Sequence, residues 1–432
     1  MKKNQGFTLI ELLAVVVILA VIALISVPLI MNVIDGARKG ALQNTAYGIA
    51  EAGKYAFTNE VIKEGSASFT AYTYENGVET SNPSGKSLNY KGEKPKTGTI
   101  LIDSKGDIAL AVYNGKYCAE KDFDDVEVTV SEKVEADCVL VATLTEVEVL
   151  VVAGGGGGAQ GYGTNAVGGG GGGGVVHQTA YTVEVGKVYN IAVGAGGAAS
   201  ASSGLWGTNG SNSSITGTGV TSVIALGGGG GMGSSNLIPG GLGLAGGSGG
   251  GASTYTGSTE AANIGGNASQ PTSASGGFGS KGGDTKGSLG GGGGGGGAGG
   301  AGVSNSNLVG GNGGPGLAFE TSGTSTYYGG GGGGSAWETN TAGLGGLGGG
   351  GNGVTRNAHT DANGVLNTGG GGGASKATVS YPGDIPGNGG SGIVIIRYYG
   401  PQKAHGGDIV TENGYTIHTF KSGTATFDII DF

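Results

Sequence analysis

Charged residues are scarce in this sequence, and those present are mostly acidic. Asp, Glu, Lys and Arg make up 12% of the 432 residues, about half the usual share, and the formal net charge is −9. Nucleic-acid binding usually needs a basic face, so this balance predicts no nucleic-acid partner.

Cysteine and histidine are also rare, with two cysteines and four scattered histidines. The histidines have no metal-ligand spacing, so no metal site is predicted. No nucleophile stands with a base and an orienting group at a recognisable spacing, and no pair of acids stands out. The sequence therefore predicts a protein that is not an enzyme.

Proline is sparse where glycine is most abundant. Residues 151–400 hold 89 of the 105 glycines but only five of the nine prolines. Collagen has a similar share of glycine, but with a strict three-residue period and abundant proline. The continuous glycine runs found here therefore exclude collagen.

Cofactor motifs are incomplete. The stretch LVVAGGGGGAQGYG (150–163) starts like a dinucleotide-binding fingerprint, but no helix-forming run follows the glycines and no acidic residue lies about 20 positions on. NPSGKS (82–87) ends like a phosphate-binding loop, yet Thr80 occupies the position of the required first glycine. No cofactor is predicted.

A long apolar stretch is present at the N-terminus. Lys2 and Lys3 precede it, and between Phe7 and Ile34 the only charge is Glu11. As a helix this stretch can span about 30 Å of hydrocarbon, and the lysines favour a cytoplasmic N-terminus. An ordinary membrane anchor is the alternative, but an anchor needs neither Glu11 nor a Gly-Phe junction before the apolar run.

The stretch KKNQGFTLIELL resembles the class III signal of type IV prepilins. The resemblance implies cleavage by prepilin peptidase after Gly6 and N-methylation of Phe7. It implies that Glu11 pairs with the N-terminal amine of a neighbouring pilin subunit and that Pro28 bends or loosens the helix. The subunit would lie in the cytoplasmic membrane before the pilus machinery assembles it into an extracellular filament.

After Ile34 the apolar residues recur at three- and four-residue spacing, which predicts a helix that continues to near Gly65. Strand candidates follow in TILIDSKGDIALAVYNGKYC (99–118), VEVTV (126–130) and CVLVATL (138–144). This order resembles the globular head of pilins, a helix packed on an antiparallel sheet. Cys118 and Cys138 lie where many pilins carry a disulfide loop; two free buried thiols are the alternative.

The glycine-rich block contains both apolar segments and long glycine runs. VEVLVVA, YTVEVGKVYNIAVGAGG, SVIALGGGGG and GIVIIRYYG read as strands, and glycine runs recur near 154–158, 168–174, 227–231, 290–297, 329–334, 346–351 and 369–373. Disorder is one interpretation, because such sequence buries little apolar surface. The other is a bundle of polyglycine-II helices, one per run, whose bare backbones hydrogen-bond to one another.

Residues 143–400 resemble glycine-rich modules of phage tail-tip adhesins and the glycine-rich domain of anaplastic-lymphoma-kinase-type receptors, through VEVLVVAGGGGGA, VGKVYNIAVGAGG and GGSGIVIIRY. The resemblance implies a framed bundle of polyglycine helices. Alternation in YTIHTF and TATFDI, with Lys-Ser-Gly between them, predicts a C-terminal hairpin that docks on the sheet containing Val147–Val152. His418 is then a packed strand residue.

The predicted fold class is α+β, with a long N-terminal membrane and filament helix, a small pilin-like antiparallel sheet, and a β-framed polyglycine-II bundle. The predicted divisions are a leader (1–6), the pilin helix (7–64, membrane span 7–34), the pilin-like head (65–142), the glycine-rich domain (143–400) and the hairpin (401–432).

The predicted function is a pilus subunit with an adhesin-like glycine-rich domain, whose partner is a glycan or another cell-surface ligand. The candidate binding loops carry polar residues and isolated aromatics: Trp206, Asn209, Asn212, Tyr255, Phe278, Tyr327, Tyr328, Trp337, Arg356, His359 and Asp361. These aromatics can equally cap the bundle. A purely structural pilus subunit with a rigid coat, and a pseudopilin of a secretion or DNA-uptake system, remain alternatives.

Overall fold

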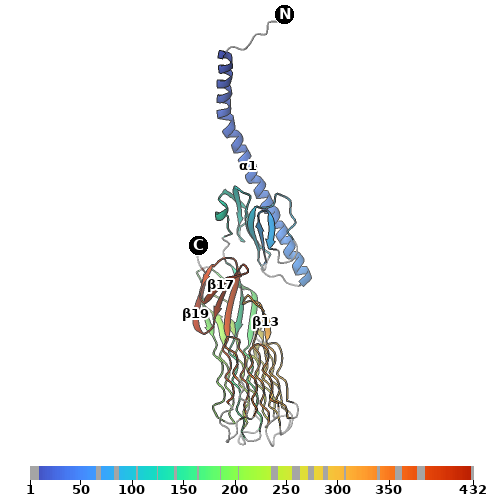
Figure 1. Cartoon of the computed structure of the whole chain (residues 1–432). Coiled ribbons are helices and arrows are strands. Elements are labelled where there is room, and N and C mark those ends of the chain that lie inside the picture. The colour runs from blue at the N-terminus through green and yellow to red at the C-terminus, as the bar shows by residue number, and fades with distance from the viewer. Residues whose placement is uncertain are drawn as a thin grey trace. The chain divides into compact units, whose positions relative to one another are not determined.

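Figure 1 shows the protein as a computed structural model. It describes residues 9–64, 70–81, 87–103, 106–123, 125–140, 144–162, 165–184, 186–202, 204–234, 242–254, 263–270, 277–285, 290–305, 308–337, 341–355, 362–376 and 385–429. The chain divides into two compact units, residues 1–143 (unit 1) and 144–432 (unit 2).

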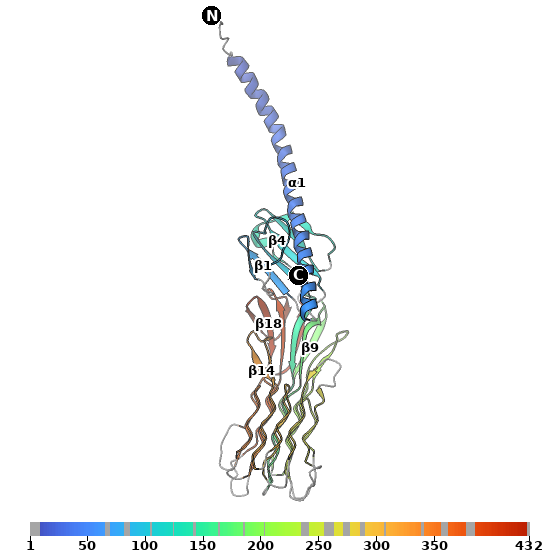
Figure 2. The same ribbon diagram turned by 90° about the vertical axis from the view of Figure 1, so that its right-hand side faces the viewer.

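Unit 1 begins with one long helix, α1 (Leu9–Glu64), which ends where the sequence predicts. It continues through Pro28 without a break and curves gently (Figure 2). Nearly every side chain between residues 9 and 34 is exposed, and α1 is long and apolar enough to cross a membrane. Its second half buries Leu42, Ala46, Ile49 and Ala50, because residues three and four apart share one helix face.

Six antiparallel strands form the sheet of unit 1, in the order β2-β1-β3-β4-β5-β6. Their bounds are β1 Thr70–Glu75, β2 Val78–Ser81, β3 Thr97–Ile102, β4 Ile108–Tyr113, β5 Tyr117–Lys121 and β6 Thr129–Glu132, and a short 3₁₀ helix follows at Glu135–Asp137. Two strand predictions need correction. The strand predicted at 126–130 begins only at Thr129, and residues 138–140 form no strand.

Side chains make the core of unit 1. Ile49 of α1 packs with Ile100 of β3 and Leu110 of β4, and all three are fully buried. Cys118 of β5 and Cys138 form a disulfide with Cα atoms 5.5 Å apart, so the alternative of two free thiols does not hold in this structure. This bond holds the segment that follows the 3₁₀ helix on the sheet.

The described strands of unit 2 form three sheets. The strand orders are β12-β8-β7-β15-β18-β17, β11-β10-β9-β19-β16 and β13-β14, with every pair antiparallel. Their bounds are β7 Glu146–Val152, β8 Val175–Thr182, β9 Val188–Val193, β10 Ser213–Thr216, β11 Val223–Ala225, β12 Gly277–Phe278, β13 Leu317–Phe319, β14 Thr326–Tyr328, β15 Ile393–Tyr399, β16 Ala404–His405, β17 Asp408–Glu412, β18 Tyr415–Phe420 and β19 Gly423–Ile429.

The two large sheets of unit 2 share an apolar core. Val149 and Val151 of β7 pack with Ile191 of β9 and Phe427 of β19. Side chains alternate along a strand, so Leu150 and Val152 face the other way and pack with the β13–β14 hairpin.

The C-terminal strands pair differently from the predicted hairpin. β18 pairs with β17 through the Asn413-Gly414 turn, and its other edge pairs with β15, which joins it to the sheet of β7. β19 crosses to the second sheet and pairs with β9. The expected pairing of 415–420 with 424–429 is therefore wrong, because the Lys-Ser-Gly link joins two sheets instead of two neighbouring strands.

Glycine runs extend from the sheets of unit 2 to its opposite end (Figure 1). Their backbones hydrogen-bond to one another in a three-residue repeat. Gly154 and Gly157 donate to Ser211 and Thr208, Gly155 and Gly158 donate to Gly390 and Gly387, and Gly156 and Ala159 donate to Gly171 and Gly168. The run at 154–159 therefore binds three others through its N–H groups alone.

Residues 168–174 form the central run. Among the described residues its N–H and C=O groups bond to six other runs, the inner ring: residues 153–159, 226–232, 247–254, 290–297, 328–335 and 369–375. Each of these bonds to the next around the ring, and 369–375 bonds back to 153–159. The six runs enclose the central run.

Outside the inner ring lie the perimeter runs: residues 194–200, 204–212, 242–246, 263–269, 279–285, 300–305, 308–316, 341–347, 349–354, 362–366 and 385–392. The prediction of one helix at 346–351 is wrong. Gly348 and Gly349 have φ of 96° and 88°, and the chain reverses there between two perimeter runs. Only glycine takes such angles without strain.

Candidate functional site

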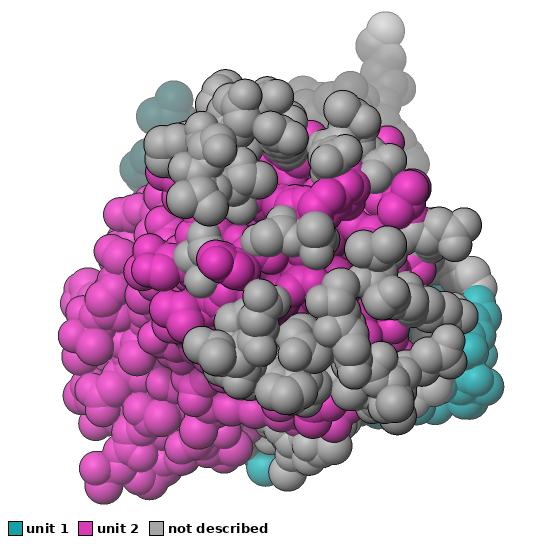
Figure 3. Space-filling view, turned by 90° about the horizontal axis from the view of Figure 1, so that it is seen from below, with its two compact units in different colours: residues 1–143 teal, residues 144–432 magenta. Residues whose placement is uncertain are grey.

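We call the end of unit 2 remote from its sheets the loop end; Figure 3 looks onto it, with the described residues of unit 2 in magenta. The predicted ligand residues do not gather there as one group. Trp206 and Trp337 stand next to links at the loop end, whereas Tyr327 and Tyr328 lie on β14 beside the sheets.

The tyrosines of β14 have opposite environments. Tyr328 is 3% exposed and packs in the core beneath the β13–β14 hairpin, so it is not available to a ligand in this structure. Tyr327 is 45% exposed. Phe278 of β12 is also near the sheets, 6.2 Å from the ring of Phe319.

Asn209 is committed to the bundle. Its Oδ1 accepts the backbone N–H of Gly230 at 2.9 Å, and its Nδ2 donates to the carbonyl of Ala245 at 3.0 Å. Asn212 similarly accepts the N–H of Gly227 at 2.9 Å. Both amides therefore hold runs together, and a contact of these residues with a ligand stays a prediction.

The same arrangement recurs around the perimeter. Asparagine side-chain carbonyls accept backbone N–H groups of neighbouring segments. The N–H of Leu344 donates to Asn312 Oδ1 and that of Gly345 to Asn352 Oδ1. The N–H of Asn388 donates to Asn363 Oδ1, and that of Ala199 donates to Asn388 Oδ1. We call Asn209, Asn312, Asn352, Asn363 and Asn388 the belt asparagines. Each is followed by glycine in the sequence. An Asn-Gly pair flanked by glycine runs was the signal that sequence reasoning missed.

Trp337 holds a buried cation. The Lys376 ammonium lies 2.9 Å from the centroid of the Trp337 indole, and Lys376 is 2% exposed. Ammonium groups bind the face of indole through its quadrupole. Around them, Ser335 Oγ accepts the N–H of Val167 and Thr254 Oγ1 accepts that of Ala166. Trp337 is thus part of a polar layer that closes the bundle.

Trp206 is in a different state. It is half-buried, and its indole Nε1 is buried without a hydrogen-bond partner within the described part of the chain. Exposed apolar and aromatic side chains stand beside other links at the loop end: Tyr162 (47%), Leu205 (48%), Leu242 (57%) and Ile385 (68%).

Several predicted site residues lie outside the described residues. These are Gly6 and Phe7 at the processing junction, and Tyr255, Arg356, His359 and Asp361 of the candidate ligand loops. Glu11 and Pro28 lie in the exposed half of α1, and their roles in assembly stay predictions.

A charged cluster on the sheet of β7 was not predicted. Glu148 accepts hydrogen bonds from Arg397 Nε at 2.8 Å, from Arg397 Nη2 and from Thr321 Oγ1 at 2.6 Å, and His177 Nε2 lies 2.9 Å from its Oε1. Burial alone would raise the pKa of Glu148, but its bonds to His177, Thr321 and Arg397 outweigh burial and lower it. The cluster fastens the segment after β13 to the sheet.

His418 is a packed strand residue. It is fully buried on β18, with Nδ1 2.7 Å from the carbonyl of Gly406 and Nε2 3.0 Å from the hydroxyl of Tyr398. Burial lowers its pKa, which keeps the imidazole neutral at neutral pH. Its two nitrogens are occupied by structural bonds.

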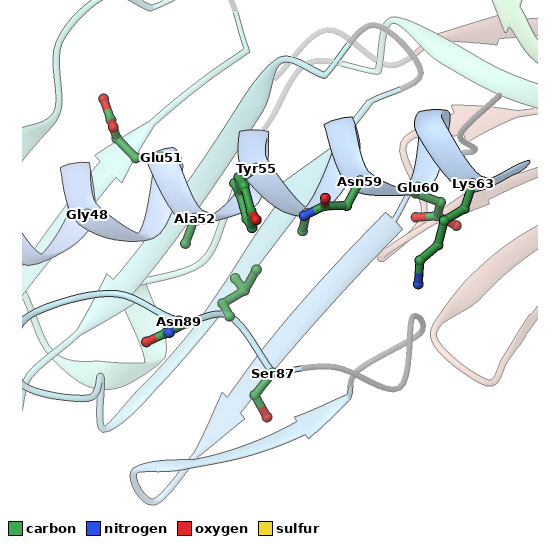
Figure 4. A pocket seen from close by; sticks show the side chains of 11 residues that line it. Gly48, Glu51, Ala52, Tyr55, Asn59, Glu60, Lys63, Ser87 and Asn89 are labelled. Atoms are coloured by element: carbon green, nitrogen blue, oxygen red, sulfur yellow. The ribbon is translucent and has the colours of Figure 1, made fainter. Parts of the chain in front are cut away.

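Unit 1 has a groove of about 460 Å³ between the last turns of α1 and residues 87–89. Figure 4 shows Tyr55 and Asn59 on the helix, with Ser87 and Asn89 across from them. Glu60 and Lys63 also line it. The lining carries both signs of charge, so it favours neither an anion nor a cation.

Comparison with known families identifies two parts of the chain. A model of the glycine-rich domain family matches residues 132–399, more than half of the sequence. A model of the prokaryotic N-terminal methylation motif matches residues 1–27. No curated protein matches the chain. The chain belongs to the glycine-rich domain family and carries, ahead of that domain, the N-terminal methylation motif of a type IV prepilin.

Proposed function

We propose that this protein is a type IV pilus subunit whose glycine-rich domain is a rigid adhesin. In this proposal the glycine runs are polyglycine-II helices, and the loop end of their bundle recognises a glycan or another cell-surface ligand. The observation that supports this proposal most directly is the three-residue repeat of hydrogen bonds among the runs.

That repeat supports polyglycine-II geometry. A helix of this type has three residues per turn, so successive N–H groups point about 120° apart. A β-strand instead alternates between two directions. In residues 154–159 the partners change with every residue and return to the same run at every third.

The spacing between runs supports the same geometry. A Cβ added to Gly155 would lie 2.1 Å from the carbonyl oxygen of Gly370, and one added to Gly158 would lie 2.0 Å from that of Gly373. At these two positions the backbones leave no room for a side chain. Slow amide exchange in residues 168–174 is the expected result; exchange at the rate of a free peptide would contradict the bundle.

The loop end suits recognition because it combines rigid support with exposed apolar side chains. The runs beneath are fixed to one another by hydrogen bonds, so the described residues next to the links have rigid support. Tyr162, Trp206 and Leu242 offer aromatic and apolar surface beside these links. Aromatic faces stack on sugar rings at low entropic cost.

Sheared filaments that carry the subunit test the adhesin proposal. We expect them to bind a defined set of glycans on an array, and Trp206→Ala or Tyr162→Ser to remove most of that signal. Tyr327→Ala is the matched control, because Tyr327 is as exposed as Tyr162 but lies beside the sheets.

A rigid structural coat is the second candidate, and a specific observation favours it. Asn209 and Trp337, both expected to contact ligand, instead hold the bundle together. Filaments that bind no glycan or cell surface, yet lose protease resistance when the bundle is disrupted, would support the coat and overturn the adhesin.

A further inference from the structure

Eight Asn-Gly pairs occur in the sequence, at Asn76, Asn114, Asn209, Asn312, Asn352, Asn363, Asn388 and Asn413. This dipeptide is the one most prone to spontaneous deamidation, because glycine has no side chain to hinder the approach of its backbone nitrogen to the asparagine Cγ. The glycine nitrogen attacks the asparagine Cγ, a new N–C bond closes a succinimide, and the side-chain nitrogen leaves as ammonia. Water then opens the ring to aspartate or isoaspartate.

Two groups must be free for this reaction. The glycine N–H must lose its proton, and the asparagine side chain must turn so that Cγ reaches the glycine nitrogen. A hydrogen bond from the glycine N–H to another segment opposes the first step. A hydrogen bond that holds the asparagine Oδ1 on a backbone N–H group, of the same turn or of another segment, opposes the second. We call each such bond an anchor.

All five belt asparagines have both anchors. Their Oδ1 atoms accept backbone N–H groups at 2.8–2.9 Å. The glycines that follow them, Gly210, Gly313, Gly353, Gly364 and Gly389, donate to carbonyls of neighbouring runs at 2.8–2.9 Å. Ring closure would break two hydrogen bonds and pull a perimeter run from its neighbours.

The two Asn-Gly pairs of unit 1 have one anchor each. Gly77, after Asn76, donates its N–H to Lys96 at 3.0 Å. Asn114 holds the N–H groups of Lys116 and Tyr117 through its Oδ1, at 3.1 and 2.9 Å. In both pairs the other anchor is missing among the described residues.

Asn413 has neither anchor within the described part of the chain. It is exposed at the tip of the β17–β18 hairpin with φ of 51°, and Gly414 follows with φ of 81°. The hairpin tip joins β18 to β17, which is the edge strand of its sheet and has every residue exposed. Gly400 donates its N–H to the carbonyl of Gly414 at 2.8 Å, so the turn is tied to the sheet through that carbonyl and not through the two groups that react.

We propose that Asn413 is the deamidation site of this protein, and that the belt asparagines are protected from the same reaction as long as the bundle is closed. The rate follows the number of anchors: Asn413 first, Asn76 and Asn114 next, and the belt asparagines last. Conversion at Asn413 places a new carboxylate one residue from Glu412. Isoaspartate also lengthens the backbone in a two-residue turn, which loosens β17.

Peptide mapping by mass spectrometry tests this on the full-length protein, incubated at mildly alkaline pH and sampled over weeks. We expect Asn413 to convert about 30-fold faster than the belt asparagines, the factor that two ordinary hydrogen bonds represent. Asn76 and Asn114 should lie between them, about fivefold slower than Asn413.

Two controls separate folding from sequence. In denaturant all eight pairs should convert at similar rates, since the residue after each asparagine is the same. Asn413→Gln should remove conversion at position 413 and leave the rates of the other seven pairs unchanged, because a glutamine would have to close a less favourable six-membered ring. Belt asparagines that convert as fast as Asn413 in the folded protein, or an Asn413 no faster than the belt, would overturn the proposal.

Discussion

The interiors of the two units are packed from different groups, side chains in unit 1 and backbone in the bundle of unit 2. Unit 1 packs side chains between a helix and a sheet, with Ile49, Ile100 and Leu110 fully buried. The bundle of unit 2 packs backbone against backbone, and its central run has no side chain over seven residues. The comparison teaches that close packing alone does not require apolar side chains, provided that every polar backbone group finds a partner.

The two interiors should therefore respond to mutation in opposite ways. In a side-chain core the damaging change is removal, because it leaves a cavity. In a backbone core the damaging change is addition, because no space exists for a methyl group. The stability change on adding or removing a methyl group at each position therefore indicates which kind of interior that segment belongs to.

Adding one methyl group to the central run should have the largest effect. In Gly170→Ala the new Cβ would lie 2.1 Å from the carbonyl oxygen of Gly156, which is backbone and cannot turn aside. We expect a loss of more than about 4 kcal/mol, enough to prevent unit 2 from folding. Soluble yield and resistance of residues 144–432 to protease measure this.

Gly40→Ala is the matched control in unit 1. Gly40 lies in α1 and a Cβ added there meets nothing within 4 Å. The same substitution should stabilise the helix by up to about 1 kcal/mol, since alanine is the better helix former. If Gly170→Ala folds with wild-type stability, the bundle is not packed backbone to backbone.

Removing methyl groups should show the reverse. Leu110→Ala empties a fully buried site on β4 and should cost about 3 kcal/mol, measured by hydrogen exchange of the strands of unit 1. Ala252→Gly removes a fully buried methyl group from the inner ring and should cost no more than about 1 kcal/mol. Equal losses at the two positions would show that the interiors do not differ in kind.

Charge supplies the third test, at Glu148 on β7 in the sheets of unit 2. Glu148→Gln keeps the shape of the side chain but removes the charge that Arg397 and His177 face. We expect a loss of about 2 kcal/mol near neutral pH, measured by thermal unfolding.

The pH dependence has a definite sign. Folding lowers the pKa of Glu148, so its contribution is present above its unfolded pKa of about 4.3 and is lost as the pH falls through the lowered folded value. The wild type should lose stability in this acid window more steeply than Glu148→Gln. Parallel pH profiles of the two proteins would mean that the carboxylate contributes nothing.

The sequence anticipates much of this architecture for physical reasons that differ between the units. Helical periodicity after Ile34 and strand alternation depend on neighbouring residues, so α1 and most strands are predictable. Six of the seven glycine runs are the central run and members of the inner ring, where a Cβ added to most of their glycines would meet the backbone of a neighbouring run. The ring member at 247–254 was missed, since Ser248 and Ala252 interrupt its glycines.

The candidate site was less predictable because its contacts are long-range. Glu148 and Arg397 meet although 249 positions separate them, and no local pattern marks such a pair. Asn209 has the composition of a binding loop, yet its amide is occupied by Gly230 and Ala245. Whether a polar side chain faces a ligand or a neighbouring run depends on packing, which composition does not contain.

The smallest expected effect concerns the boundary between backbone core and solvent. Asn352→Ala removes the side-chain carbonyl that accepts the N–H of Gly345, and should cost about 1 kcal/mol. Leu347→Ala, on a neighbouring perimeter run, removes a side chain that is 63% exposed and should cost almost nothing. The larger loss at the polar residue would show that side chains on the perimeter act mainly as hydrogen-bond acceptors for the bundle. Thermal unfolding of both variants decides this, and a larger loss for Leu347→Ala would place apolar contacts, not hydrogen bonds, at the edge of the bundle.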